Sequence, residues 1–127
     1  MLEILERFDN EGYEHITEAA GDSIAHITEA MDGGKAIGFI AYSYEADRTI
    51  VYDYDDGGDL MLCDGLVRSV MFKSVLKAIE VMEFRLPEKE KFTNLVRLKF
   101  LTEGENICEN LDSFMNGCQN CKKNAEK

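Results

Sequence analysis

One stretch, residues 36–44 (AIGFIAYSY), most strongly limits how this 127-residue chain can fold. Its apolar side chains alternate between two faces, with one face made by Ile37, Phe39 and Ala41 and the other by Ile40, Tyr42 and Tyr44. A strand that is apolar on both faces has to be covered on both faces. We therefore expect residues 36–44 to form a central strand of a sheet that is packed on both sides.

Turn signals on either side place that strand in an antiparallel meander. Residues 24–30 (IAHITEA) lead into the segment 31–35 (MDGGK), whose Asp-Gly-Gly sequence is a strong hairpin signal. Residues 45–47 form a second turn, and residues 48–55 (RTIVYDYD) then alternate as a strand does. The pattern predicts three consecutive antiparallel strands.

Helical and strand patterns alternate in the rest of the chain. Residues 2–8 (LEILERF) predict a short amphipathic helix, and residues 60–80 carry the strongest helical pattern of the sequence. Residues 81–86 have strand character, and residues 87–97 begin with proline and acidic residues, as helices favour. Residues 100–111 predict a strand, a turn and a second short strand.

The order of these elements fixes the fold class. A strand–helix–strand crossover favours parallel pairing of residues 48–55 with residues 81–86. We therefore predict an α+β fold in which a mixed sheet combines an antiparallel meander with a parallel crossover and carries helices on both faces. Residues 1–111 are expected to form one domain, and residues 112–127 a C-terminal tail.

The charge distribution limits the partners of the protein. The net charge is −11, and residues 9–64 hold fourteen acidic side chains but only Lys35 and Arg48 as basic ones. This half would repel nucleic acid and anionic membranes and would attract a cationic amine. The N-terminal sequence lacks the basic and apolar regions of a signal peptide, and charges interrupt every long apolar stretch. We expect a cytoplasmic protein without nucleic-acid or membrane partners.

The element order resembles the core of the GCN5-related N-acetyltransferase (GNAT) superfamily over residues 24–111. AIGFIAYSYEADRTIVYDY is similar to the family's "G-F-I-A-Y … I-Y-D" strand pair, and residues 97–100 (RLKF) are similar to its "K-L-G-F" helix ending. In that family a loop and the helix after it hold the pyrophosphate of coenzyme A. The resemblance implies an acyl-CoA-dependent N-acetyltransferase, with acetyl-CoA as cofactor and an amine as substrate.

The phosphate-binding positions of that family are mostly not matched. Its pattern, Arg/Gln-x-x-Gly-x-Gly/Ala, aligns with Leu60, Cys63 and Gly65, and only the last of these matches. The resemblance makes four positions at this helix start the candidates for contact with the cofactor: Cys63, Asp64, Gly65 and Leu66. Four aspartates nearby would oppose a diphosphate: Asp55, Asp56, Asp59 and Asp64. We therefore expect acetyl-CoA to bind weakly or undetectably.

The catalytic position is not matched either. The family's general-acid tyrosine aligns with Leu95, which cannot donate a proton, and the glycine of its Leu-Gly-Phe motif aligns with Lys99. Tyr52, Tyr54 and Glu83 are the candidates to replace that acid, and the sequence does not select among them. Two functions stay open: an N-acetyltransferase with an atypical cofactor loop, or a non-catalytic GNAT-like domain that binds a ligand or a protein.

Two further patterns suggest metals. Cys118 and Cys121 form a C-x-x-C motif in the tail, and zinc needs four ligands, so the two thiols could be reactive or could bind a metal across a homodimer. We expect both cysteines to lie outside the packed core. The acidic segment 53–59 only superficially resembles a calcium loop, because a strand precedes it and glycine falls at the fifth position. We read it as an acidic turn before a helix and assign no metal site.

Overall fold

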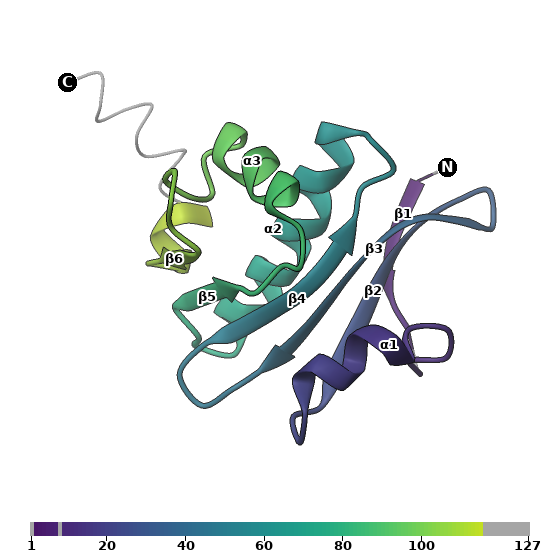
Figure 1. Ribbon diagram of the computed structural model, residues 1–127, viewed down its shortest axis with the longest axis horizontal. Helices are drawn as coiled ribbons and strands as arrows, with labels where there is room; N and C mark the ends of the chain where they lie inside the picture. The colour runs from purple at the N-terminus through teal and green to yellow at the C-terminus, as the bar shows by residue number, and fades with distance from the viewer. Residues whose placement is uncertain (1, 8, 116–127) are drawn as a thin grey trace.

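A six-stranded mixed sheet forms the centre of the computed structural model, which describes residues 2–7 and 9–115 (Figure 1). The strands follow one another across the sheet in chain order: β1 (Leu2–Glu6), β2 (Ala25–Asp32), β3 (Lys35–Tyr44), β4 (Thr49–Asp55), β5 (Val81–Phe84) and β6 (Ile107–Glu109). Neighbouring strands are antiparallel except β4 and β5, which are parallel. The predicted fold class is confirmed.

Helices cover both faces of this sheet (Figure 1). One face carries α1 (Glu14–Thr17) and a 3₁₀ turn, η1 (Glu18–Ala20). The other face carries α2 (Leu60–Leu76) and α3 (Lys89–Arg97), which follow β4 and β5 respectively. Among the described residues, no helix is long and apolar enough to cross a membrane.

The strand β3 is interior, as its two-sided apolar pattern predicts. Ile40 and Tyr42 are fully buried in the larger core, which α2 and α3 close. Ala41 lies in the smaller core on the opposite face, together with Ile16 of α1 and Ile50 of β4. Each alternating face of the strand is therefore packed from Phe39 onward, whereas Ile37, which the pattern placed on a covered face, is 38% exposed near the start of the strand.

The N-terminal prediction is wrong, because residues 2–6 form an edge strand instead of a helix. Ile4 pairs with Ala30 in an antiparallel register, and Arg7 continues the ladder by donating its backbone N–H to Ile27. Leu2 and Leu5 also have the spacing of one helix turn, which is why the short segment suggested a helix. Pairing with β2 satisfies the backbone of a segment too short to be a stable helix alone.

Two element boundaries also differ from the prediction. The helix α2 ends at Leu76 and not at residue 80, because Ala78 adopts a left-handed conformation (φ 64°) and Ile79 donates its N–H to the carbonyl of Ser74. In the segment 100–111 only β6 forms a strand. Phe100 and Leu101 are buried, but their N–H groups close the end of α3 by binding the carbonyl of Leu95.

Packing continues past the predicted end of the domain. Leu111 is fully buried, and the ring of Phe114 stacks on that of Phe100 with 5.3 Å between centroids. Cys118 and Cys121, and with them the predictions for the tail, lie outside the described residues.

Candidate functional site

The parallel strands β4 and β5 create a crevice at their carboxyl ends. They pair only from Thr49 to Val51 on one side and from Met82 to Phe84 on the other, whereas β4 continues to Asp55. The start of α2 lies at the same end of the sheet (Figure 1). In open α/β arrangements, ligands bind outside the carboxyl ends of parallel strands, next to a helix N-terminus.

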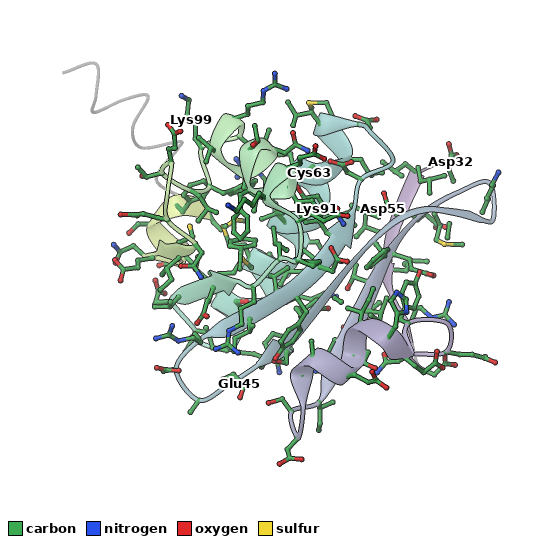
Figure 2. All side chains as sticks on the ribbon, viewed as in Figure 1. Asp32, Glu45, Asp55, Cys63, Lys91 and Lys99 are labelled. Carbon is green, nitrogen blue, oxygen red and sulfur yellow. The ribbon has the colours of Figure 1, made fainter. Side chains whose placement is uncertain are left out.

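A lysine of α3 binds to the end of β4 at this crevice. The Nζ atom of Lys91 donates to Oδ1 of Asp53 at 2.7 Å and to the carbonyl of Tyr54 at 2.6 Å. The hydroxyl of Tyr54 in turn donates to the carbonyl of Lys91 at 2.7 Å. Lys91 is labelled in Figure 2. Two acceptors at the end of β4, Oδ1 of Asp53 and the carbonyl of Tyr54, are therefore bound by the protein's own side chain.

The start of α2 is closed by its own capping residue. Asp59 is the N-cap, and its Oδ1 accepts from the N–H of Met61 at 2.9 Å and of Leu62 at 3.3 Å. Free N–H groups at a helix start are what binds an anion such as a phosphate. Here a carboxylate that belongs to the chain occupies that position.

The loop before α2 is organised in the same way. Gly57 and Gly58 have left-handed conformations, with φ values of 61° and 82°. Their N–H groups donate to Oδ1 of Asp55 and Oδ1 of Asp56 respectively, both at 2.9 Å. The glycines turn the chain sharply, but the amides they present bind aspartates of the loop.

The four predicted cofactor contacts lie inside the first turns of α2. Cys63 and Leu66 are fully buried in the core, and burial raises the pKa of the Cys63 thiol to about 11. The single N–H on Nε of Arg68 is shared between the two carboxylate oxygens of Asp64, each at 3.1 Å. Gly65 faces outward from the core. Contact of these residues with a cofactor stays a prediction.

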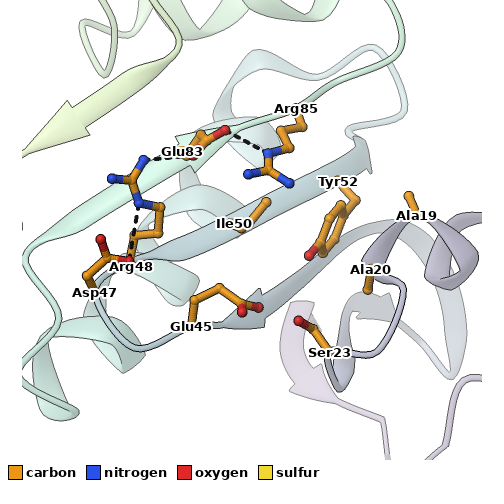
Figure 3. A pocket seen from close by; sticks show the side chains of 10 residues that line it. All are labelled: Ala19, Ala20, Ser23, Glu45, Asp47, Arg48, Ile50, Tyr52, Glu83 and Arg85. Carbon is orange, nitrogen blue, oxygen red and sulfur yellow. Dashed lines mark hydrogen bonds and ion pairs between the residues drawn. The ribbon is translucent and has the colours of Figure 1, made fainter.

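A polar cavity of about 430 Å³ lies on the opposite face of the sheet, beside η1 (Figure 3). Side chains of β4, β5, the turn between β3 and β4, and the segment around η1 line it: Ala19, Ala20, Ser23, Glu45, Asp47, Arg48, Ile50, Tyr52, Glu83 and Arg85. Two of the predicted catalytic candidates, Tyr52 and Glu83, therefore face one cavity. The third, Tyr54, points to the other side of β4.

Glu83 is held between two arginines in this cavity. Its Oε2 accepts from Nε of Arg85 at 2.6 Å, and its Oε1 accepts from a terminal nitrogen of Arg48 at 2.8 Å. The bond from Arg85, and after it the bond from Arg48, lowers the pKa of this carboxyl below its usual value. Glu83 is therefore ionised at neutral pH and cannot supply a proton as a general acid.

The hydroxyl of Tyr52 is part of a directed hydrogen-bond chain. Ser43 donates its only hydroxyl proton to Oε2 of Glu45 at 2.7 Å, so at 2.8 Å it has to accept from Tyr52. The bond from Ser43, followed by one from Ser23, lowers the pKa of the Glu45 carboxyl. The cavity therefore holds an ionised carboxylate at one side, with Tyr52 oriented toward it (Figure 3).

Comparison with known proteins gives a structural likeness without a sequence match. No model of a protein family and no curated protein matches the sequence. The ribosomal-protein-S18-alanine N-acetyltransferase of Escherichia coli superposes with a TM-score of 0.59 at 14% identity, over 84% of this chain and 89% of the other. An acetyltransferase of Streptococcus agalactiae superposes with a TM-score of 0.54 at 17% identity, over 77% and 80%.

A third solved structure gives the same result. The PaiA N-acetyltransferase of Thermoplasma acidophilum, in complex with coenzyme A, superposes with a TM-score of 0.51 at 13% identity, over 74% of this chain and 64% of the other. This chain has a GNAT-like fold. At these identities the likeness establishes the fold alone, and the chemistry has to be argued from the residues.

One backbone feature agrees with the GNAT-like alignment of residues 97–100. Lys99, at the position of the family's glycine, has a left-handed conformation with φ of 70°. Leu95, at the position of the general-acid tyrosine, is fully buried. A left-handed conformation is one that glycine adopts without strain, and a buried leucine has no proton to donate.

The sequence did not single out Lys91, Arg48 or Arg85 as site residues. Lys91 looked like one of several charges in the first turns of a helix. Arg48 reaches Glu83 because β4 and β5 are parallel in the observed register, in which Ile50 lies opposite Glu83, whereas Arg85 follows Glu83 two residues along the chain. The crossover predicted that pairing, but not its register.

The described residues offer no gathering of three histidine, cysteine or acidic side chains that could hold a metal ion.

Proposed function

We propose that this GNAT-like protein is a non-catalytic binding protein, which holds a small zwitterionic molecule in the cavity between β4, β5 and η1. The observation that carries the proposal is the closed crevice at the carboxyl ends of β4 and β5. Lys91 binds both Asp53 and the carbonyl of Tyr54 there, and Asp59 occupies the helix start. An acyl-CoA would have to displace an ion pair and a capping carboxylate before its diphosphate met a positive group.

The cavity on the other face offers both signs of charge. Arg85 uses Nε to bind Glu83, and its guanidinium extends over the cavity beside Ile50 and Tyr52 (Figure 3). Glu45 lies across the cavity with an ionised carboxylate. A guanidinium pairs well with a carboxylate, and a carboxylate pairs with an ammonium group. A ligand that carries an acid and an amine a few bonds apart would satisfy both sides.

Titration calorimetry tests the proposal with named probes. Acetyl-CoA is expected to give no saturable binding in the low micromolar range. Glycine, L-alanine and L-lysine are expected to bind more tightly than acetate or methylamine, which each carry one of the two charges. Arg85→Ala is expected to lower that affinity about tenfold or more, since a charged hydrogen bond contributes about 1.5–3 kcal/mol. Arg97→Ala, at the exposed end of α3, is the matched control.

Two results would contradict the proposal. One is a low-micromolar dissociation constant for acetyl-CoA with the unaltered protein. The other is a cavity that binds the zwitterions no better than it binds acetate and methylamine.

A second candidate function is an acyl-CoA-dependent N-acetyltransferase with an atypical loop, which is supported by the separation of β4 from β5 after Val51. The PaiA structure, which holds coenzyme A, has a similar fold. If this candidate is correct, Asp59→Ser should raise the affinity for acetyl-CoA, because serine still caps the helix but carries no charge. Acetylation of an amine by the unaltered protein would favour this candidate over the first.

A further inference from the structure

Three large apolar side chains stand out from one line along α2. Met61, Phe72 and Leu76 are 75%, 53% and 70% exposed. At 100° per residue these positions fall within an arc of about 60°, opposite the buried side of the helix. Phe72 and Leu76 are one turn apart, and Met61 lies about 16 Å further along the same line of the helix. Exposed apolar side chains that lie together mark interaction surfaces more often than single ones do. We call this line, including the glycine described next, the α2 stripe.

A notch interrupts the α2 stripe at Gly65. A Cβ atom added there would have one neighbour within 4 Å, Cδ1 of Ile4 at 3.4 Å, so β1 borders this position on one side and the rest of it is open. Glycine inside a helix is destabilising relative to alanine. The stripe therefore combines protruding side chains at Met61, Phe72 and Leu76 with one gap.

The order of these positions is complementary to itself. Two α2 helices can lie antiparallel with a two-fold axis between Arg68 and Ser69. Each residue of one copy then faces the residue of the other copy that lies equally far on the opposite side of this axis. Met61 of one copy then faces Leu76 of the other, and Phe72 faces Gly65. A two-fold interface uses the same patch on both copies, so each contact occurs twice.

Charge along the helix favours a second copy over a strongly charged partner. Within the acidic chain, residues 65–77 carry three basic side chains and no acidic one. On the two flanks of the α2 stripe, Arg68 pairs with Asp64 at 3.1 Å and Lys73 pairs with Glu6 at 3.1 Å. Two copies that each carry a net charge of −11 can approach here with little repulsion. An acidic or basic partner would find these charges already paired.

We propose that the protein forms a homodimer through the α2 stripe, with the two helices antiparallel and Phe72 of each copy packed against Gly65 of the other. The exposed area of three side chains is a few hundred Å² per copy, below the roughly 800 Å² per partner of a standard stable interface. The dimer is therefore weak and forms in a concentration-dependent way.

Sedimentation velocity over a range from low micromolar to millimolar chain tests this, with a reducing agent present so that thiols cannot link the copies. The unaltered protein is expected to shift from monomer to dimer. Phe72→Glu and Leu76→Glu are each expected to weaken the dimer at least tenfold. Ile24→Glu is the control, because Ile24 is 77% exposed and is not part of α2.

Gly65→Ala tests the register and separates dimer loss from misfolding. The added methyl group fills the notch that receives Phe72, so the dimer should weaken several-fold. Because alanine suits a helix better than glycine, the thermal midpoint of the dilute protein should hold or rise. The proposal is overturned if the unaltered protein stays monomeric throughout, if Ile24→Glu weakens the dimer as much as Phe72→Glu does, or if Gly65→Ala dimerises as well as the unaltered protein.

Discussion

Replacing Lys91 by methionine would remove the ammonium group from the crevice between β4 and β5 and keep most of the aliphatic side chain. Two acceptors would lose their partner: Oδ1 of Asp53, at 2.7 Å, and the carbonyl of Tyr54, at 2.6 Å. The Lys91 and Asp53 side chains are only 23% and 17% exposed. Water therefore replaces the lost bonds only in part.

The expected loss follows from these exposures. A hydrogen bond that involves a charged group contributes about 1.5–3 kcal/mol, and breaking a fully buried ion pair costs about 3–5 kcal/mol. Because this pair retains some solvent contact, we expect Lys91→Met to lower the free energy of unfolding by about 2–3 kcal/mol. For a domain of this size, that corresponds to a fall of roughly 10 °C in the thermal midpoint.

Urea unfolding followed by circular dichroism would measure the loss, with Lys89→Met at an exposed position of α3 as the control. The double variant with Asp53→Asn should lose at least about 1 kcal/mol less than the sum of the two single variants, because the partners interact directly. A loss below about 0.5 kcal/mol for Lys91→Met, or strict additivity with Asp53→Asn, would refute the reasoning that Lys91 closes the crevice.

Two further predictions concern backbone strain and pH. Ala78→Gly should raise the free energy of unfolding by about 0.5–1 kcal/mol. The left-handed conformation costs an L-residue about 1–2 kcal/mol, and the greater conformational entropy of glycine in the unfolded chain offsets part of the gain. Ser69→Gly, inside α2, should lower the free energy of unfolding in the same urea assay. Glu83→Gln should be about 1 kcal/mol less stable at neutral pH. The pKa of Glu83 is lower in the folded state, so the carboxylate stabilises the fold above the unfolded pKa of 4.5, and this stabilisation is lost as the pH falls through the lower folded pKa. The difference in stability between the two proteins should therefore close in acid. A constant difference down to about pH 2 would contradict this.

Much of the fold could be predicted because apolar periodicity reports directly on burial. The stretch 36–44 required cover on both faces, and the structure supplies it with α1 on one side and α2 on the other. The segment 2–6 could not be assigned in this way. Leu2, Ile4 and Leu5 fit a helix turn and a strand almost equally well, and only Ile4 is partly buried. The choice is made by pairing with β2, which no local pattern contains.

The candidate site was less accessible to sequence reasoning, because it depends on contacts between distant residues. Tyr52 and Glu83 were candidates by residue type, and the parallel pairing of β4 and β5 brings them to one cavity. The role of Lys91 depends on how α3 crosses the end of β4, which is a matter of helix packing. A lysine in a helical pattern usually indicates a solvated face, and nothing in the sequence distinguishes this one.

Lys99 shows why the fold and the function of this chain separate. The residue keeps a left-handed turn with φ of 70° at the cost of some strain, because the turn lets Phe100 donate its N–H to Leu95 and bury its ring. The start of α2 shows the opposite case, in which the turn is free of strain but its polar group is already bound. Gly57 provides a left-handed turn without strain, but its amide binds the carboxylate of Asp55. Core packing thus enforces the GNAT-like backbone, whereas the polar groups that could bind a cofactor are directed to the protein itself. A fold inferred from packing therefore cannot by itself assign the acetyltransferase chemistry to this chain.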